Sequence, residues 1–193
     1  NNSMKVGLFF GSFNPVHLGH LVIANYMATF TGLDEVWMVV SPHNPLKQRK
    51  GLSNMYDRLE MVRLATENSE QLKVSNIEFT LPQPSYTVDT LIYLKEKYPG
   101  KEFAIIMGAD NLSSFKKWKN YEVILNNYQI YVYPRPGVTI EEWKDHPSIV
   151  ITETPQMDIS STFIRKAIKD KKNIQYLVPD AVIAFIEGKG MYK

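Results

Sequence analysis

The chain has 193 residues, of which 44% are hydrophobic and 12% aromatic, as is typical of a soluble globular protein with one buried core. Its formal net charge of +2 at pH 7 gives no reason to expect nucleic acid or a membrane surface as a partner. The lack of cysteine excludes disulfides and thiolate metal sites and, with no apolar run of about 20 residues, favours a cytoplasmic protein.

Short apolar runs of β type alternate with helical patterns along the chain. We expect strands at 5–10, 35–40, 73–79, 103–107, 129–133 and 149–151, and helices at 18–30, 54–67, 88–98 and 113–125. This alternation predicts the α/β class, with a Rossmann-like, doubly wound, mainly parallel sheet, helices on both faces and a small C-terminal helical part. We take residues 1–3, before Met4, as the remnant of an expression tag and expect one domain over residues 4–193.

The second expected helix has a clear apolar face. Met55, Leu59, Val62 and Ala65 recur at spacings of four, three and three, which places them in one buried stripe. Ser53 stands just before this helix, and we expect its hydroxyl to cap the first turn.

Residues 11–20 read G-S-F-N-P-V-H-L-G-H and join the first expected strand to the first expected helix. The first N–H groups of a helix have no partner within it and the helix dipole favours an anion, so this junction predicts a phosphate site. Gly11 and Gly19 allow a ligand to approach the backbone closely. His17 and His20 lie on one face of the first turn, where two cationic donors suit phosphoryl or nucleotidyl transfer.

Two other interpretations of His17 and His20 stay open. Neutral imidazoles are good zinc ligands, although the turn contains no aspartate or glutamate to accompany them. The histidines can also be core or capping residues without a ligand.

Residues 158–165 read D-I-S-S-T-F-I-R and predict a second helix start suited to an anion. Ser160 or Ser161 should cap this helix, leaving N–H and hydroxyl groups available to a ligand. Arg165 follows about one turn later and can offer a forked guanidinium to a phosphate. Taken alone, this pattern also fits a capped helix with a surface arginine. Two such helix starts in one chain favour a shared phosphate site.

The two motifs together resemble the nucleotidylyltransferase superfamily that carries the H-x-G-H signature. Within it, the chain is most similar to the bacterial nicotinate mononucleotide adenylyltransferases of NAD biosynthesis. The similarity extends from Met4 almost to residue 193 and includes P-H-N-P-L-K at 42–47, P-S-Y-T-V-D-T at 84–90 and G-A-D-N at 108–111. It implies adenylyl transfer from ATP to nicotinate mononucleotide, with release of pyrophosphate.

The resemblance also implies roles for particular residues. His17, His20, Lys47 and Arg165 would stabilise charge during transfer. The residues implied to bind ATP are Gly11, Ser12, Phe13, His17, Gly19, His20, Gly108, Asp110, Ile159, Ser160, Ser161 and Arg165. Those implied to bind the mononucleotide are Asn44, Lys47, Tyr86, Thr87 and Trp118.

Two of these implied roles have plain structural alternatives. Asp110, expected with Gly108 at the ribose hydroxyls of ATP, can instead cap the helix that follows it. Trp118, expected to stack on the pyridine ring of the mononucleotide, can instead pack within the protein.

The implied reaction needs no covalent nucleophile, because the attacking phosphate oxygen is already an anion. Catalysis would come from in-line positioning and from offsetting charge, with Mg²⁺ carried by the ATP phosphates and no metal site in the protein. Asn14 stands where many bacterial members have aspartate, which leaves nicotinamide mononucleotide as an alternative acceptor. A non-catalytic ATP or NAD sensor is an alternative of another class. The oligomeric state is open, with a homo-oligomer as one option.

Overall fold

The computed structural model describes residues 3–43 and 51–193. Asn44 and Lys47, which the resemblance assigns to the mononucleotide, lie outside the described residues. Within them the strands are β1 (Met4–Gly11), β2 (Glu35–Val40), β3 (Leu72–Ser75), β4 (Lys101–Gly108), β5 (Ile130–Tyr133) and β6 (Ile149–Ile151). The helices are α1 (Leu18–Phe30), α2 (Met55–Thr66), α3 (Thr87–Lys97), α4 (Ala109–Ser113), α5 (Tyr121–Asn127), α6 (Ser161–Lys169) and α7 (Asp180–Lys189), with short 3-10 turns η1 (Ile77–Thr80) and η2 (Phe115–Lys117).

The described strands form one parallel sheet in the order β3-β2-β1-β4-β5-β6. The predicted α/β, Rossmann-like, doubly wound architecture is therefore confirmed. The strand order reverses between β1 and β4, and open parallel sheets bind ligands beyond the carboxyl ends of the strands at such a point. Phe9 pairs with Ile106, so the carboxyl ends of β1 and β4 finish side by side.

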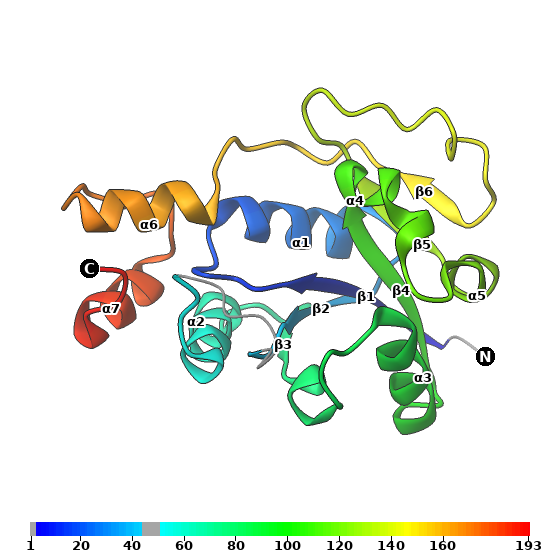
Figure 1. The fold of residues 1–193 in the computed structure, drawn as a ribbon, viewed down its shortest axis with the longest axis horizontal. Coiled ribbons are helices and arrows are strands. Elements are labelled where there is room, and N and C mark those ends of the chain that lie inside the picture. Colours follow the sequence, from blue (N-terminus) through cyan, green and yellow to red (C-terminus); the bar gives the residue numbers. More distant parts are fainter. Residues whose placement is uncertain (1–2, 44–50) are drawn as a thin grey trace.

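Side chains alternate between the two faces of the sheet because the strand repeat is two residues. Phe9 of β1 packs with Met27 of α1 and Met61 of α2 in one buried cluster, whereas Leu8 packs with Leu91 of α3 in a second cluster. Helices thus cover both faces. Figure 1 shows α7, in red, beside α2, in cyan, which accounts for the expected C-terminal helical part.

Two expected elements are wrong. The third strand ends at Ser75 instead of residue 79. The Ser75 hydroxyl accepts the N–H of Ile77 as the chain turns into η1. Side-chain oxygens of this kind compete with the sheet for backbone N–H groups. The helix expected at 113–125 is instead three short pieces, α4, η2 and α5. Trp118 is extended and Asn120 adopts a left-handed conformation at φ 51°, which interrupts any continuous helix.

The expected cap of α2 is wrong by one residue. Asn54, not Ser53, is the N-cap, and its side-chain oxygen accepts the N–H of Tyr56 at 2.8 Å. The Ser53 hydroxyl instead reaches the turn after β1, where it donates to Asn14. No helix in the described parts of the chain is both long and apolar enough for a membrane span.

Candidate active site

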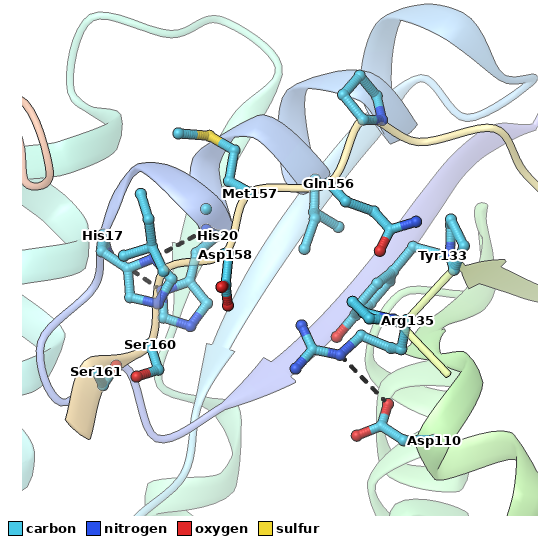
Figure 2. Close-up of a pocket in the computed structure, with 16 residues that line it drawn as sticks. His17, His20, Asp110, Tyr133, Arg135, Gln156, Met157, Asp158, Ser160 and Ser161 are labelled. Carbon is cyan, nitrogen blue, oxygen red and sulfur yellow. Dashed lines mark hydrogen bonds and ion pairs between the residues drawn. The ribbon is translucent and has the colours of Figure 1, made fainter. Parts of the chain in front are cut away.

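A cavity of about 440 Å³ lies at the carboxyl edge of the sheet, between the start of α1, the end of β5 and the segment that leads into α6 (Figure 2). Seven of the residues expected to bind ATP line it: His17, Gly19, His20, Asp110, Ile159, Ser160 and Ser161. The two motifs, far apart in the sequence, therefore meet at one site.

The two histidines cap α1 and each other. His17 is the N-cap, and its Nδ1 accepts the N–H of His20 at 3.4 Å, while Nδ1 of His20 accepts the N–H of His17 at 3.1 Å. Their rings stack with centroids 3.7 Å apart. Gly19 is required beside them, since a Cβ there would lie 2.8 Å from Cε1 of His17. The capping interpretation is thus correct, and the two histidines also line the cavity.

The histidines are neutral donors rather than the cationic ones expected from the sequence. Burial lowers the pKa of His17 to about 4, and burial together with the neighbouring His17 holds the pKa of His20 well below its usual value. The edge of Phe13 lies against His20, with ring centroids 5.0 Å apart, and helps to exclude water from it. Because each Nδ1 accepts a backbone N–H, the single ring proton belongs on Nε2, which is left to donate to a ligand.

The start of α1 offers fewer backbone donors than expected. The N–H of Leu18 donates to the carbonyl of Leu177 at 2.9 Å, and that of His20 is used in the cap. The imidazole N–H groups of the two histidines therefore replace some of the backbone hydrogen-bond donors that were expected at this helix start.

The start of α6 is capped by Ser160, as predicted, through a hydrogen bond from the N–H of Phe163 at 3.1 Å. The Ser161 hydroxyl is engaged as well, because it donates to the carbonyl of Pro15 at 2.9 Å. Arg165 donates from Nη1 to the carbonyl of Asn14 at 2.9 Å and does not line the cavity. The two helix starts are thus joined directly through the main chain of the turn.

The opposite wall of the cavity carries an exposed ion pair. Nε of Arg135 lies 4.0 Å from Oδ1 of Asp110, and Figure 2 shows the Arg135 side chain reaching across from the end of β5. The N-cap of α4 is Gly108, so Asp110 is not the cap of that helix. A Cβ on Gly108 would lie 2.5 Å from the Asp110 carboxylate, which explains the glycine at this position.

Sequence reasoning missed nine of the residues that line this cavity, and three of these, Tyr133, Arg135 and Asp158, carry ionisable side chains. Arg135 lies two residues after the fifth expected strand, whose carboxyl end is expected at the ligand-binding edge of a parallel sheet. That position was the available signal. Burial raises the pKa of Tyr133, with the Asp110 charge contributing, so its hydroxyl is protonated at neutral pH.

The described residues expected at the mononucleotide lie outside the lining of this cavity. Tyr86, just before α3, is 45% exposed, and Nζ of Lys119 lies 4.7 Å from the centre of its ring. Thr87 is the first residue of α3. Trp118 is half-buried and meets Phe115 edge-on, with centroids 5.2 Å apart. The structure therefore brings Tyr86 close to the segment that carries Trp118.

A buried polar cluster supports the turn from below the cavity. Arg58 of α2 is fully buried and donates to the carbonyls of Ser12, Ser41 and Ser53 at 2.9, 2.7 and 3.0 Å. The turn after β1 and both ends of the loop between β2 and α2 are thereby held by one guanidinium. Three other residues expected at ATP, Gly11, Ser12 and Phe13, lie outside the lining of the cavity, and Ser12 is one of the partners of Arg58.

The described residues do not favour the zinc interpretation of the histidines. In the part of the chain that is described, no group of three His, Cys, Asp or Glu side chains is arranged to hold a metal ion. Both Nδ1 atoms of the pair are also used in the cap of α1.

The fold and the site define a Rossmann-like α/β protein with a cavity at the switch point of its sheet, where such folds bind their ligands. The chain belongs to the cytidylyltransferase-like family, whose model matches residues 8–167. The resemblance found in the sequence is thereby confirmed.

Individual relatives agree with this family. A Flavobacterium johnsoniae protein named as a probable nicotinate-nucleotide adenylyltransferase is 57% identical over 98% of this chain and 100% of its own length. A Bacteroides fragilis protein of the same name is 47% identical over 92% of this chain and 89% of its own. Among solved structures, the Plasmodium falciparum nicotinic acid mononucleotide adenylyltransferase complexed with NaAD has a TM-score of 0.80 at 20% identity, over 98% of this chain and 97% of that one.

Proposed function

We propose that this protein transfers the adenylyl group of ATP to nicotinate mononucleotide, giving nicotinate adenine dinucleotide and pyrophosphate in NAD biosynthesis. The observation that carries the proposal is the neutral His17–His20 pair, which lies beside the start of α6 in the lining of one cavity (Figure 2). The relatives named for this activity, which match the chain along nearly its whole length, support the same function.

In the proposed reaction a phosphate oxygen of the mononucleotide attacks the α-phosphorus of ATP. The bond from that phosphorus to the bridging oxygen breaks, and its electrons leave with pyrophosphate. Nε2–H groups of His17 and His20 donate to phosphate oxygens as charge develops there. Arg165 and Lys47, the latter outside the described residues, supply positive charge. Preorganised donors act without solvent reorganisation, which makes them effective in a shielded site.

We propose that Mg²⁺ is carried mainly by the ATP phosphates, where it offsets their charge. The donor set fits this role, since the carboxylates that line the cavity are Asp110 and Asp158 and one of them is paired with Arg135. Magnesium bound through phosphates and water needs few protein ligands.

Nicotinate rather than nicotinamide mononucleotide is the proposed acceptor, despite asparagine at position 14. The Asn14 side chain is 5% exposed and is not part of the cavity lining. Its difference from aspartate therefore bears on the support of the turn rather than on direct contact with an acceptor.

The test is incubation of the purified protein with ATP and Mg²⁺, with each mononucleotide in parallel and with ATP alone. We expect one pyrophosphate and one dinucleotide per turnover with the nicotinate substrate, both measured by mass spectrometry. Faster release with nicotinamide mononucleotide would assign the other acceptor. Binding of ATP without release in any mixture would indicate a sensor, and release with ATP alone would indicate a hydrolase.

A further inference from the structure

The side chain of Asn14 is the centre of a buried hydrogen-bond network under the turn. Its Oδ1 accepts from the N–H of Ser53 at 3.2 Å, from the Ser53 hydroxyl at 2.9 Å and from the Tyr192 hydroxyl at 2.6 Å. Its Nδ2 donates to the carbonyl of Gly51 at 2.9 Å. Both ends of the amide are thus used, as a buried polar group requires.

The main chain of the same turn is tied to α6. The carbonyl of Asn14 accepts from Arg165, and the next carbonyl, of Pro15, accepts from the hydroxyl of Ser161. Movement of Asn14 would therefore shift the start of α6 relative to His17, three residues further along the chain. Both segments contribute to the lining of the cavity, where they lie next to each other (Figure 2).

Tyr192 reaches this network from the segment after α7, and 178 positions separate it from Asn14. Its backbone is left-handed, with φ at 64°, which is unfavourable for a tyrosine. Its hydroxyl also lies 3.0 Å from the Ser53 hydroxyl. Burial raises the pKa of Tyr192 to about 12, so the phenol remains a donor at neutral pH.

We infer that Tyr192 is a positioning residue: its hydroxyl fixes Asn14 and thereby sets the spacing between the histidine pair and the start of α6. This inference rests on the proposed function, because the expected change in kcat refers to the proposed adenylyl transfer. Tyr192 does not line the cavity, so it acts through Asn14 and not on the substrate.

The test compares Tyr192→Phe with Tyr176→Phe. Tyr176 is a matched control because it also has a left-handed backbone, with φ at 69°, but is 79% exposed. We expect Tyr192→Phe to lower kcat about five- to tenfold, as loss of one well-placed hydrogen bond allows, with KM for nicotinate mononucleotide within about twofold of the parent. Tyr176→Phe should leave both unchanged.

A merely structural role would lower the melting temperature and leave kcat per folded molecule unchanged. That result, or equal kcat in the two phenylalanine variants, would overturn the inference. Tyr192→Phe combined with Ser161→Ala provides a second readout. Tyr192 holds the side chain of Asn14, and Ser161 holds the carbonyl of the next residue, Pro15. If both act by positioning this turn, their effects on kcat should not add. Additive effects would contradict the inference.

A binding measurement keeps this inference separate from the proposed function. Calorimetry measures the affinity for the α,β-methylene analogue of ATP, in Mg²⁺, without turnover. This affinity depends on how the histidine pair and the start of α6 are placed in the cavity. We expect about fivefold weaker binding in Tyr192→Phe than in Tyr176→Phe. If the parent protein fails to form dinucleotide but this difference is found, the proposed reaction fails and the positioning role stands. Equal affinities would overturn the positioning role whatever the reaction.

Discussion

The two walls of the cavity differ in burial and in charge. His17 is 5% exposed and, with His20, presents neutral N–H groups whose orientation is fixed by the cap of α1. Across the cavity, the side chains of Asp110 and Arg135 are 53% and 47% exposed and hold opposite charges 4.0 Å apart. A shielded donor stabilises developing charge without reorganisation, whereas an exposed ion pair exchanges its partner readily for a charged ligand. From this difference we expect the histidine wall to serve the chemical step of the proposed reaction and the charged wall to serve binding.

The largest expected effect tests the histidine wall. His20→Ala removes one preorganised donor and should lower kcat at least about 10²-fold, while the affinity for ATP changes less. Steady-state pyrophosphate release and calorimetry measure the two quantities. His146→Ala is the matched control, since His146 is outside the cavity lining. Near-normal turnover by His20→Ala would remove the assigned role.

A second variant removes the support beneath that wall. Arg58→Met keeps an unbranched side chain but leaves three buried carbonyls without their donor. We expect the free energy of unfolding to fall by at least about 3 kcal/mol, since each unsatisfied buried group costs about 1–3 kcal/mol. Urea unfolding measures the change. A loss below about 1 kcal/mol would show that the loops hold one another without Arg58.

The pH dependence of stability tests whether the histidine wall is neutral. The pKa of His17 is about 4 in the folded protein and about 6.5 when exposed, so the unfolded chain binds more protons between these values. Its contribution is fully present above pH 6.5 and is lost as the pH falls toward 4, by about 3 kcal/mol.

The variant for this test is His17→Asn, because asparagine also caps a helix but does not titrate. Urea unfolding at several pH values should give a shallower loss of stability for the variant than for the parent. Comparing the two proteins cancels the contribution of the carboxylates. Parallel curves would contradict a lowered pKa for His17.

The smallest expected effect belongs to the charged wall. Arg135→Ala breaks a half-exposed ion pair, and the free energy of unfolding should change by less than about 1 kcal/mol. The same variant should raise KM for ATP more than it lowers kcat. A loss of kcat as large as that of His20→Ala would contradict the assignment of the charged wall to binding alone.

Local patterns predicted much of this architecture. The run from β1 through the turn to α1 was recoverable because strand, turn and cap are each set by neighbouring residues, and the cap by Ser160 was recoverable for the same reason. The broken helix after β4 was not, because Asn120 adopts its left-handed conformation in a segment whose apolar spacing still suits a helix.

The support of the site was beyond sequence reasoning for a different reason. Contacts such as Tyr192 with Asn14 join side chains 178 positions apart, and periodicity carries no information about them. The charge state of His20 depends likewise on burial against Phe9 and Phe13, which only the packed structure reveals. Residue types thus indicated which two segments meet at the cavity, and packing decided how the side chains of these segments are held.

Nuclear magnetic resonance of protein labelled with ¹⁵N at histidine tests most directly whether the buried pair enters the reaction as neutral Nε2–H donors. At pH 7 without nucleotide, His17 and His20, assigned with His17→Asn and His20→Ala, should each show one protonated and one unprotonated nitrogen. The proton should be on Nε2 and the hydrogen-bond acceptor should be Nδ1. Rings protonated on both nitrogens, or on Nδ1 alone, would contradict the account.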